Sequence, residues 1–593
     1  MVVRSLTLED YAVLVVMLAV SMAIGVYFAW TSRGSAQEFL TGGRKLSIFP
    51  VSMSLIASLM SSITVLSNPA EVYCFGAVFA CFGVTYITAT AIASETFLPV
   101  IYRLSITSTY EYLEMRFNRA TRLLGTVLFI LQTILMTGLV IYGPAVALNQ
   151  VTGIDLWGGI ISTGVVCTVY CTLGGIKAVV WTDVFQIGVM LAGYLAAIIK
   201  SVIIQGGVST IISDSQQGGR LNFFDFDIDP LRRHTFWTIT VGGTFTGLSL
   251  VQRFISCKTV TQARAALLIN VLGLSAFLAS SVFAGMCLYS VYKNCDPWTS
   301  GQISAPDQLM PYLVMDILSD YAGLPGLFLT AVCSGSLSTV SSSINALAAV
   351  TLEDLIKPYF RLSEKHQFWM SKGLCFLFGM LCISMAGFTS FMGGMMQANM
   401  MINGIVGGSV LGLFSLGIFC PFANTKVRLN HYFTRFNLNL SDVTGWVLYP
   451  PSAAKTRPLS LTADGCNFTS TAGPNWTSTL LPTEPSSTLT PLMLDRNEED
   501  LWDSSWQSPS YLYFGLIGSV TAFIVGVTVS LLTGKESEKP LLKKSFVFNF
   551  YLSLFLGGLR NKVESRLMIN KEDTFSYHIY MFIKERVGIA AAG

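Results

Sequence analysis

The sequence predicts an all-α polytopic membrane protein. Of its 593 residues, 52% are hydrophobic and 12% are charged, whereas soluble domains carry about 25% charged residues. Apolar runs of about 20 residues recur along most of the chain, and each is long enough to cross about 30 Å of hydrocarbon. These runs are too long and too uniformly apolar for the strands of a membrane barrel, so a helical bundle is expected. The net charge of +3 is too small to indicate a nucleic-acid partner.

The first apolar run, Tyr11–Trp30, is predicted to be a permanent span and not a cleaved leader. It follows the acidic residues Glu9 and Asp10 instead of a basic region, and it lacks a small-residue cleavage site. About a dozen spans are predicted in all. The others are Ile48–Tyr73, Ala77–Leu104, Leu123–Leu148, Leu156–Gly175, Ala178–Ile204, Thr235–Val251, Ala266–Tyr292, Leu324–Val350, Met370–Phe388, Met400–Phe419 and Tyr513–Leu532.

Basic residues gather in alternate loops, which predicts that those loops are cytoplasmic and that the N-terminus lies outside. The loop 205–234 is the main exception, because it carries Arg220, Arg232 and Arg233 but is predicted to be extracellular. Long loops follow the rule poorly, so this exception does not overturn the orientation. The basic loops contain Arg33, Arg44, Lys45, Arg103, Arg116, Arg119, Arg122, Arg253, Lys258, Arg264, Lys357, Arg361, Lys365 and Lys372.

The segment 451–509 differs from the rest of the chain in being rich in Ser, Thr and Pro. It contains glycosylation sequons at Asn467 and Asn475, and a further sequon precedes it at Asn439. Two sequons in such a loop favour an extracellular, glycosylated segment.

Most of the cysteines lie inside apolar runs, and no CxxC pair or His/Cys cluster is present. We interpret them as small buried side chains and predict no metal centre of the zinc type. Cys295 and Cys466 lie in loops instead, where they can pair if both face outside.

Two predicted spans are unusually polar. The first, Ser54–Pro69, carries several hydroxyls and is predicted to break at Asn68–Pro69; the second, Cys333–Asn345, carries a denser set. Hydroxyls in membrane helices often only hold helices together. Na⁺, however, requires several oxygen ligands, which hydroxyls such as those of Ser338 and Thr339 and the carbonyls of a broken helix provide without a buried net charge. Both interpretations stay open from the residues alone.

Asp183 stands at the edge of an apolar run, where an acid is a functional candidate by default. The alternative is a loop-edge acid at the cytoplasmic surface beside Lys177. No paired carboxylates, nucleophile–base pair or metal-ligand cluster stands within a span, so no enzyme and no cofactor are expected. The pair Gly174–Gly175 indicates a tight turn or close packing and not a phosphate site.

Several long stretches resemble the sodium/solute symporter family, which includes glucose, iodide, multivitamin and monocarboxylate carriers. Within that family the chain is most similar to the sodium-coupled monocarboxylate transporters, especially the low-affinity, electroneutral type. The resemblance rests on Ile106–Phe117, Ala147–Gly153, Thr172–Gln186, Ile303–Pro311 and Ser338–Ile356.

The resemblance implies two inverted five-helix repeats, like those of the bacterial leucine transporter, with extra N- and C-terminal spans. The expected organisation is residues 1–47 for the extra span and its loop, 48–204 for the first repeat, 205–234 for an extracellular loop, 235–422 for the second repeat, 423–510 for a polar loop, 511–534 for the final span and 535–593 for a tail.

The resemblance also implies the site and the cargo. Sodium would bind the carbonyls of Ala57, Met60 and Gly335 and the hydroxyls of Ser338 and Thr339. The substrate would lie near Thr64 and Tyr86, and Asp183 is a candidate for a second ion site or a gate. The implied cargo is lactate, pyruvate, nicotinate and short-chain fatty acids, carried across the plasma membrane, apically in epithelia. Alternatives are iodide or a vitamin such as biotin or pantothenate, or a transport-defective sensor or channel.

The chain departs from the family pattern in three places. The stretch Gly247–Gln252 is about two turns shorter, in the helix that opens the second repeat and is expected to face the substrate. Residues 424–442 are too polar to insert readily where relatives have a span. Met136 stands where close relatives have Tyr.

Overall fold

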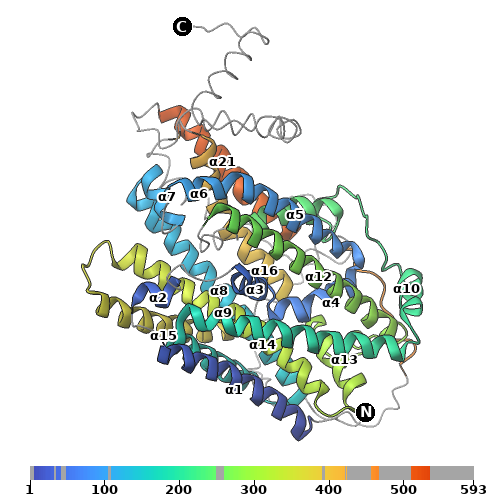
Figure 1. Ribbon diagram of the computed structural model, residues 1–593. Coiled ribbons are helices and arrows are strands. Elements are labelled where there is room, and N and C mark those ends of the chain that lie inside the picture. Colours follow the sequence, from blue (N-terminus) through green and yellow to red (C-terminus); the bar gives the residue numbers. More distant parts are fainter. Residues whose placement is uncertain are drawn as a thin grey trace, which may run out of the picture. The chain divides into compact units, whose positions relative to one another are not determined.

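The computed structural model describes residues 6–31, 35–41, 48–104, 109–248, 259–389, 394–420, 423, 456–466 and 509–533, and all of these belong to one unit, Met1–Glu536. The described segments contain helices and connecting loops but no strand (Figure 1). The α-helices are α1 (Leu8–Thr31), α2 (Ala36–Thr41), α3 (Ile48–Leu59), α4 (Ser62–Phe75), α5 (Phe82–Ile92), α6 (Leu98–Leu104), α7 (Thr109–Arg116), α8 (Arg119–Thr152), α9 (Leu156–Ile204), α10 (Val208–Gln217), α11 (Gly243–Leu248), α12 (Val260–Tyr292), α13 (Leu309–Leu318), α14 (Leu324–Val350), α15 (Glu364–Thr389), α16 (Met395–Ile402), α17 (Gly408–Phe419) and α21 (Phe514–Thr533).

Short 3₁₀ or π turns extend or join several of these helices. They are η2 (Ala77–Cys81), η3 (Ala93–Phe97), η4 (Thr238–Gly242), η6 (Pro306–Gln308), η7 (Thr351–Ile356), η8 (Asn403–Gly407) and η12 (Tyr511–Tyr513). Within the described ranges, nine continuous helical segments are long and apolar enough to cross a membrane, or ten when the bent pair α3–α4 is taken as one span. The predicted all-α membrane architecture is therefore confirmed.

Two of the dozen predicted spans are not found as separate spans. The predicted span Thr235–Val251 is described only to Leu248, as the short elements η4 and α11, and is not among the counted segments. The other difference lies in α9. Two predicted spans are joined in one 49-residue helix that bends at Gly175, whose backbone angles (φ 61°, ψ −161°) lie outside the helical range. A side chain at Gly175 would place its Cβ 2.6 Å from the carbonyl oxygen of Phe39. Glycine is needed here both for the positive φ and for the close approach of α2. The close-packing interpretation of Gly174–Gly175 is thus confirmed.

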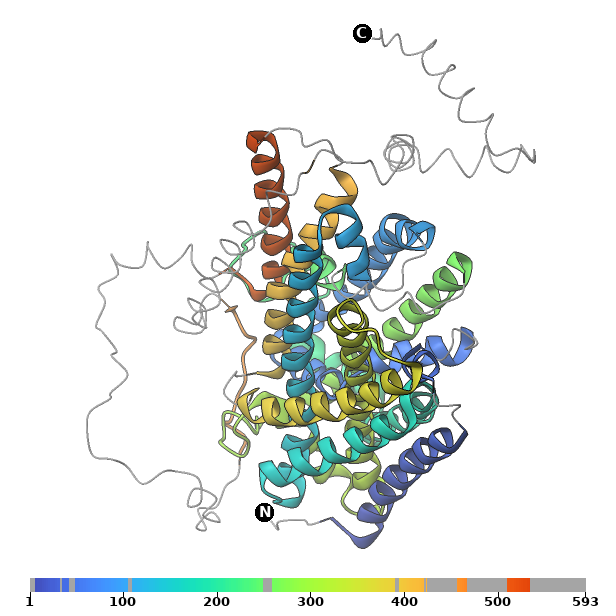
Figure 2. The same ribbon diagram turned by 90° about the vertical axis from the view of Figure 1, so that its left-hand side faces the viewer.

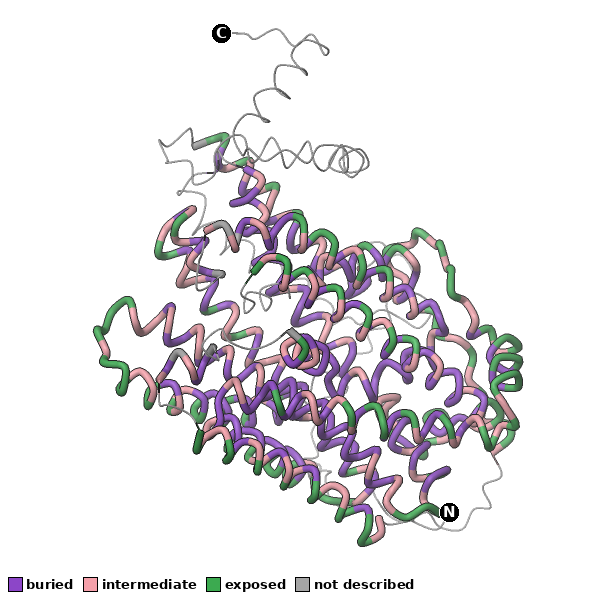
Figure 3. The backbone as a smooth tube through the Cα atoms, in the orientation of Figure 1, coloured by how far each residue is buried: buried purple, intermediate pink, exposed green. Residues whose placement is uncertain are grey.

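The polar helix α14 lies at the centre of the bundle. The span Leu324–Ile356, formed by α14 and η7, buries 89% of its most apolar stretch, whereas α1 buries 17% of its own. Figure 3 shows the same contrast between buried central helices and exposed outer faces. A hydroxyl-rich helix in the centre can direct its side chains at other helices instead of at lipid, which is where polar groups in a membrane are tolerated.

The contacts between helix ends define two opposite faces of the bundle. At the face predicted to be outside, Asp10 of α1 accepts a hydrogen bond of 2.9 Å from the backbone N–H of Gly326. At the face predicted to be cytoplasmic, Arg122 of α8 bonds Asp354 of η7, and Arg264 of α12 lies 3.1 Å from Glu95. We call these the outer and inner faces.

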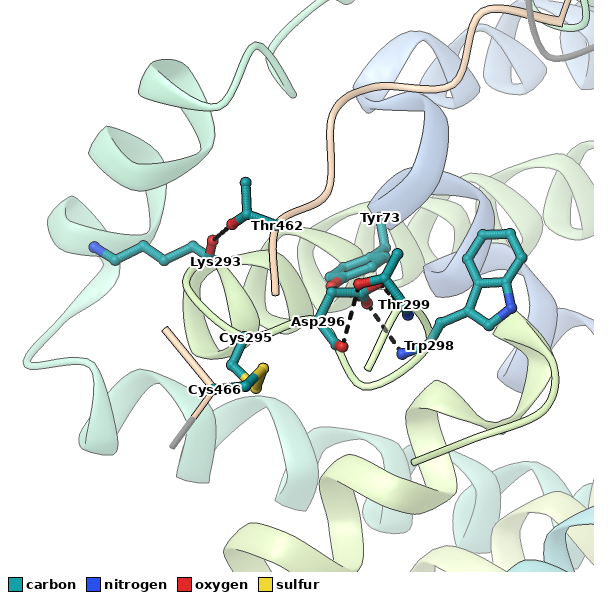
Figure 4. Close-up of a disulfide and its surroundings, with 8 residues drawn as sticks. All are labelled: Tyr73, Lys293, Cys295, Asp296, Trp298, Thr299, Thr462 and Cys466. Carbon is teal, nitrogen blue, oxygen red and sulfur yellow. Dashed lines mark hydrogen bonds between the residues drawn. A yellow bond between two sulfur atoms is a disulfide. The ribbon is translucent and has the colours of Figure 1, made fainter. Parts of the chain in front are cut away.

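Cys295 and Cys466 form a disulfide at the outer face, with their Cα atoms 4.9 Å apart (Figure 4). The predicted pairing is confirmed. Further bonds hold residues 456–466 in the same place: the N–H of Leu459 donates to the carbonyl of Cys74 at 2.8 Å, and that of Asp296 donates to the carbonyl of Thr462 at 2.9 Å. Asn467 and Asn475, the predicted glycosylation sites, lie outside the described residues.

The last span, α21, packs along α17 (the red and orange helices in Figure 2). Gly408 and Gly412 approach it so closely that a Cβ on either would lie 2.6 to 2.7 Å from an α21 carbonyl oxygen. The hydroxyl of Ser519 donates to the carbonyl of Gly408 at 2.9 Å. Small residues four apart allow such backbone contact between membrane helices. The polar segment 424–442 lies outside the described residues.

Candidate sodium and substrate site

The candidate site begins at a break in the first predicted repeat. Helices α3 and α4 meet at an angle of 54°. Ser61 at the break has extended backbone angles (φ −88°, ψ 174°). Such a break exposes the last carbonyls of α3 and the first amides of α4 in the middle of a span. The predicted break at Asn68–Pro69 is wrong, because α4 continues through both residues. One proline removes one hydrogen bond, which a packed membrane helix tolerates.

Helix α14 passes directly beside this break. The hydroxyl of Thr339 donates to the carbonyl of Ser58 at 3.0 Å and to that of Gly335 at 3.1 Å. A Cβ at Gly335 would lie 3.1 Å from both the carbonyl oxygen of Met60 and the nitrogen of Ser62, so the two backbones are in contact. The structure therefore brings the two polar stretches together. All of the residues predicted to bind sodium are buried at this junction: Ala57, Met60, Gly335, Ser338 and Thr339.

Asp183 of α9 adds a buried carboxylate to the same place. It is fully buried, it accepts a hydrogen bond from the hydroxyl of Ser54, and Ser338 lies against it. The loop-edge alternative is wrong: Asp183 is inside α9, and Lys177 pairs with Glu38 instead. The Asp183 Oδ1 atom and the Ser338 hydroxyl make no hydrogen bond of good geometry with the described residues.

A third helix, α8, contacts the break through the backbone carbonyl of Val140, which has no partner within α8 because Pro144 follows it by four residues. Pro144 has no N–H to donate to the carbonyl of Val140, four residues earlier. The hydroxyls of Ser62 and Ser336 both donate to that carbonyl, each at 2.9 Å. A Cβ at Gly143 would lie 2.5 Å from the Ser62 hydroxyl, so glycine permits the approach. Sequence reasoning missed this junction, although a proline inside an apolar run was a visible signal.

The predicted substrate residues lie on two helices. Thr64 is half-buried near the start of α4, and Tyr86 is half-buried on α5, with its ring centroid 6.4 Å from that of Phe82. Helix α5 is tied to the opening of the second predicted repeat, because the Thr85 hydroxyl donates to the carbonyl of Ile239 at 2.9 Å. That opening helix is described to the end of α11 at Leu248; the rest of the predicted shortened stretch lies outside the described residues.

Met136 faces another irregular helix. The side-chain amide of Asn403 lies 3.5 Å from its sulfur and 2.8 Å from the side-chain oxygen of Asn399. Asn403 belongs to the π turn η8, and its own oxygen accepts from Gln132 of α8 at 2.9 Å. The departure from Tyr at position 136 thus falls beside a polar contact between α8 and η8.

Comparison with known proteins agrees with this architecture. The sequence profile of the Sodium:solute symporter family matches residues 39–429. The chain is 53% identical to sodium-coupled monocarboxylate transporter 1 of Xenopus laevis, covering 98% of this chain and 90% of that protein. It is 50% identical to human sodium-coupled monocarboxylate transporter 2, over 91% of this chain and 87% of the relative, and 44% identical to the human sodium/iodide cotransporter, over 90% and 84%.

A solved structure of a Na⁺-coupled sialic acid symporter, in a substrate-bound outward-open state, shares the fold. It covers 90% of this chain and 100% of its own with a TM-score of 0.67, at 22% identity. At that identity the likeness concerns the fold alone.

Proposed function

Because the chain belongs to the sodium:solute symporter family, we propose that it couples the entry of Na⁺ to the uptake of small monocarboxylates. Lactate, pyruvate, nicotinate and short-chain fatty acids are the proposed cargo, and alternating access at the plasma membrane, apically in epithelia, is the proposed mode. The observation that carries the proposal is the junction between the α3–α4 break and the hydroxyls of α14. It occurs in a chain that is 53% identical to a sodium-coupled monocarboxylate transporter.

The break offers opposite partial charges to the two proposed ligands. The carbonyls of Ala57 and Met60 end α3 and attract a cation, together with the carbonyl of Gly335 and the hydroxyls of Ser338 and Thr339. The amides that begin α4, just before Thr64, attract the carboxylate of the substrate. Since one break serves both, binding of the ion favours the geometry that the substrate needs, and the reverse also holds.

Asp183 is proposed as part of a second ion site that shares Ser338 with the first. A lone ionised carboxylate buried in a bundle is strongly unfavourable without a compensating cation or proton. The hydroxyls of Ser54 and Ser338 supply neutral oxygens around it. Occupancy of this site would set the number of Na⁺ ions per carboxylate, and therefore whether transport carries net charge.

Uptake of labelled lactate by cells that express the full chain, in Na⁺ or in choline, tests the proposal when normalised to surface protein. Saturable uptake that requires Na⁺ and is unaffected by iodide or biotin supports it. Inhibition of lactate uptake by iodide would favour the iodide alternative, since the iodide cotransporter is 44% identical. A Na⁺ current without lactate uptake would favour a channel, and surface protein without either activity would indicate a transport-defective chain.

A further inference from the structure

The structure explains why three arginines occur in a loop predicted to be extracellular. Arg220 is fully buried and donates to backbone carbonyls, including that of Ser460 at 2.7 Å. Arg232 pairs with two aspartates of the same loop. Arg233 instead pairs with Glu71, which lies on α4. Of these three arginines, Arg233 is therefore the one whose charge is matched by a carboxylate on the broken helix.

The guanidinium of Arg233 is oriented to bind a carboxylate through two of its nitrogens. Its Nε lies 3.2 Å from one oxygen of Glu71 and its Nη2 bonds the other oxygen, so the contact is bidentate. Its Nη1 donates to the neutral amide oxygen of Gln397 on α16 at 3.2 Å. The rings of Phe75 and Tyr511 lie 4.7 and 5.3 Å from the guanidinium carbon. The carboxylate bound by Arg233 therefore lies beside two aromatic rings.

Glu71 keeps a partner even without Arg233. The Nε2 atom of His234 lies 2.8 Å from Oε2 of Glu71, the same oxygen that the Nε of Arg233 contacts. Burial lowers the pKa of His234, so its ring is neutral at neutral pH and donates one hydrogen bond to Glu71. The Nδ1 atom makes no hydrogen bond within the described part of the chain. Loss of the arginine contact therefore does not leave Glu71 without a donor.

The cluster stands above the proposed substrate position. Glu71 follows Thr64 by seven residues on α4, which is two helical turns, so both lie on one face about 10.5 Å apart along the axis. Glu71 is the residue nearer the outer face. The side chains of Arg233 and Glu71 keep 16% and 10% of their surface exposed, and they lie on the outer side of Thr64.

We propose that Arg233 is an outer docking site for the carboxylate of the substrate, and that Glu71 occupies this site as an internal carboxylate until substrate displaces it. The proposal rests on the symport of monocarboxylates proposed above. A bidentate guanidinium contact is selective for planar carboxylates. Phe75 and Tyr511 would contact the short apolar part of the acid, and His234 would hold Glu71 while Arg233 is engaged.

The proposal predicts opposite effects for the two partners of one ion pair. Arg233→Gln should raise the KM for lactate about tenfold or more, because a charge-assisted contact is lost, with the Na⁺ activation curve unchanged. Glu71→Gln should lower the KM, because it removes the internal competitor. The double variant Glu71→Gln with Arg233→Gln leaves no unpaired charge and should keep the high KM. Arg232→Gln, one residue away and paired within its own loop, is the matched control and should leave the KM unchanged.

Two results would overturn the docking site. If both single variants raise the KM and the double variant restores it, the pair is only structural. If the lactate concentration that half-maximally raises the melting temperature is the same for purified Glu71→Gln protein as for the wild type, with lactamide as the uncharged control, Glu71 does not compete with lactate at Arg233. This binding measurement does not need transport. A wild type without uptake therefore counts against the symport function, while the response to lactate still decides the docking site.

Discussion

At the scale of the residue, Thr339 and Gly335 hold α14 against the break. Thr339 does so by donating to the Ser58 carbonyl at 3.0 Å, and Gly335 does so by having no side chain. Both features bring carbonyl and hydroxyl oxygens within the reach of one small ion. We therefore expect the proposed site to respond both to an added methyl group at Gly335 and to the loss of the Thr339 hydroxyl.

Gly335→Ala is expected to raise the Na⁺ concentration that half-activates lactate uptake. Its Cβ would lie 3.1 Å from the Met60 carbonyl, which is closer than ordinary contact, so α14 and the break must separate by a few tenths of an ångström. The measurement is the Na⁺ dependence of uptake at fixed lactate. Gly373→Ala on α15, where a Cβ meets no atom within 4 Å, is the control and should leave the curve unchanged. If the Na⁺ activation curves of Gly335→Ala and the wild type are equal, the proposed arrangement of sodium ligands is wrong.

Asp183→Asn is expected to make Na⁺ activation less steep, because the neutral amide no longer attracts a second cation. The Hill coefficient for Na⁺ and the charge moved per lactate are the quantities to measure. An unchanged Hill coefficient with normal surface expression would limit Asp183 to a structural role through Ser54.

Sequence reasoning located the hydroxyls of the candidate site but not their partners. Ser338 and Thr339 stand in a conspicuous run of hydroxyl residues, and the family resemblance added Ala57 and Met60. The pairing of Arg233 with Glu71 joins residues 162 positions apart, and no local pattern indicates it. Such contacts depend on how the helices pack, which a single sequence does not specify.

At the scale of the element, the central feature is a junction of three helices at one carbonyl. Pro144 frees the Val140 carbonyl of α8, and hydroxyls of α4 and α14 share it. A backbone acceptor in a membrane must find a donor, so the proline converts a bond within α8 into bonds between helices. The junction joins α4, which carries the proposed substrate position, to two neighbouring helices.

Pro144→Ala is expected to slow lactate uptake while raising the melting temperature of the protein. Alanine restores the N–H that bonds the Val140 carbonyl, which stabilises α8 but displaces Ser62 and Ser336. Thermal unfolding in detergent and the initial rate of uptake, measured on the same preparation of variant, check the two parts. Faster uptake, or a lower melting temperature, would contradict the role given to this carbonyl.

Helix boundaries were predicted less well than the helices themselves. The Asn68–Pro69 pair looked like a break, but α4 continues through it, and the break lies at Ser61. Helix propensity alone does not decide whether the helix breaks at Ser61 or at Asn68–Pro69. Serine is tolerated inside membrane helices, and proline is tolerated there where packing is good. The bend at Gly175 was indicated by its glycine pair, and its strict need for glycine appeared only with the approach of Phe39.

At the scale of the whole molecule, the outer-face contacts determine where the Ser/Thr-rich loop begins and ends. Cys466 is bonded to Cys295. At the other end of the loop, the N–H of Ser510 donates to the carbonyl of Pro230 at 2.9 Å. Both ends therefore lie at the outer face, as a glycosylated extracellular loop requires. The connection from α17, which ends at the inner face, runs through residues outside the described ranges.

Asn467→Gln and Asn475→Gln are each expected to remove one glycosidase-sensitive step in the apparent mass of the protein. A sequon immediately after Cys466 is accessible to glycosylation only if the disulfide face is extracellular. Glycosidase digestion of wild type and variants, followed by electrophoresis, shows the number of occupied sites. A wild-type chain that is insensitive to the glycosidase would argue against the assigned orientation.

Hydropathy was sufficient to predict a membrane-spanning helical bundle, because every span must be long and apolar. The apolar runs correspond to long helices such as α1, α8, α12, α14 and α21. The positions of the basic residues, and not hydropathy, predicted which loops are cytoplasmic. Hydropathy carries no information on which helix is central; the polar α14 is central because its hydroxyls need protein partners.

The measurement that tests the central claim most directly is the Na⁺ activation curve of lactate uptake for Thr339→Val, compared with Thr330→Val. Both changes are isosteric and both affect buried threonines of α14, but Thr330 donates only within its own helix, to Gly326 at 2.7 Å. The account predicts that Thr339→Val raises the half-activating Na⁺ concentration about tenfold, the loss expected for one ligand oxygen to a charged group, while Thr330→Val retains the wild-type curve. Coincident curves for all three proteins would contradict a sodium site at the junction of α14 with the α3–α4 break.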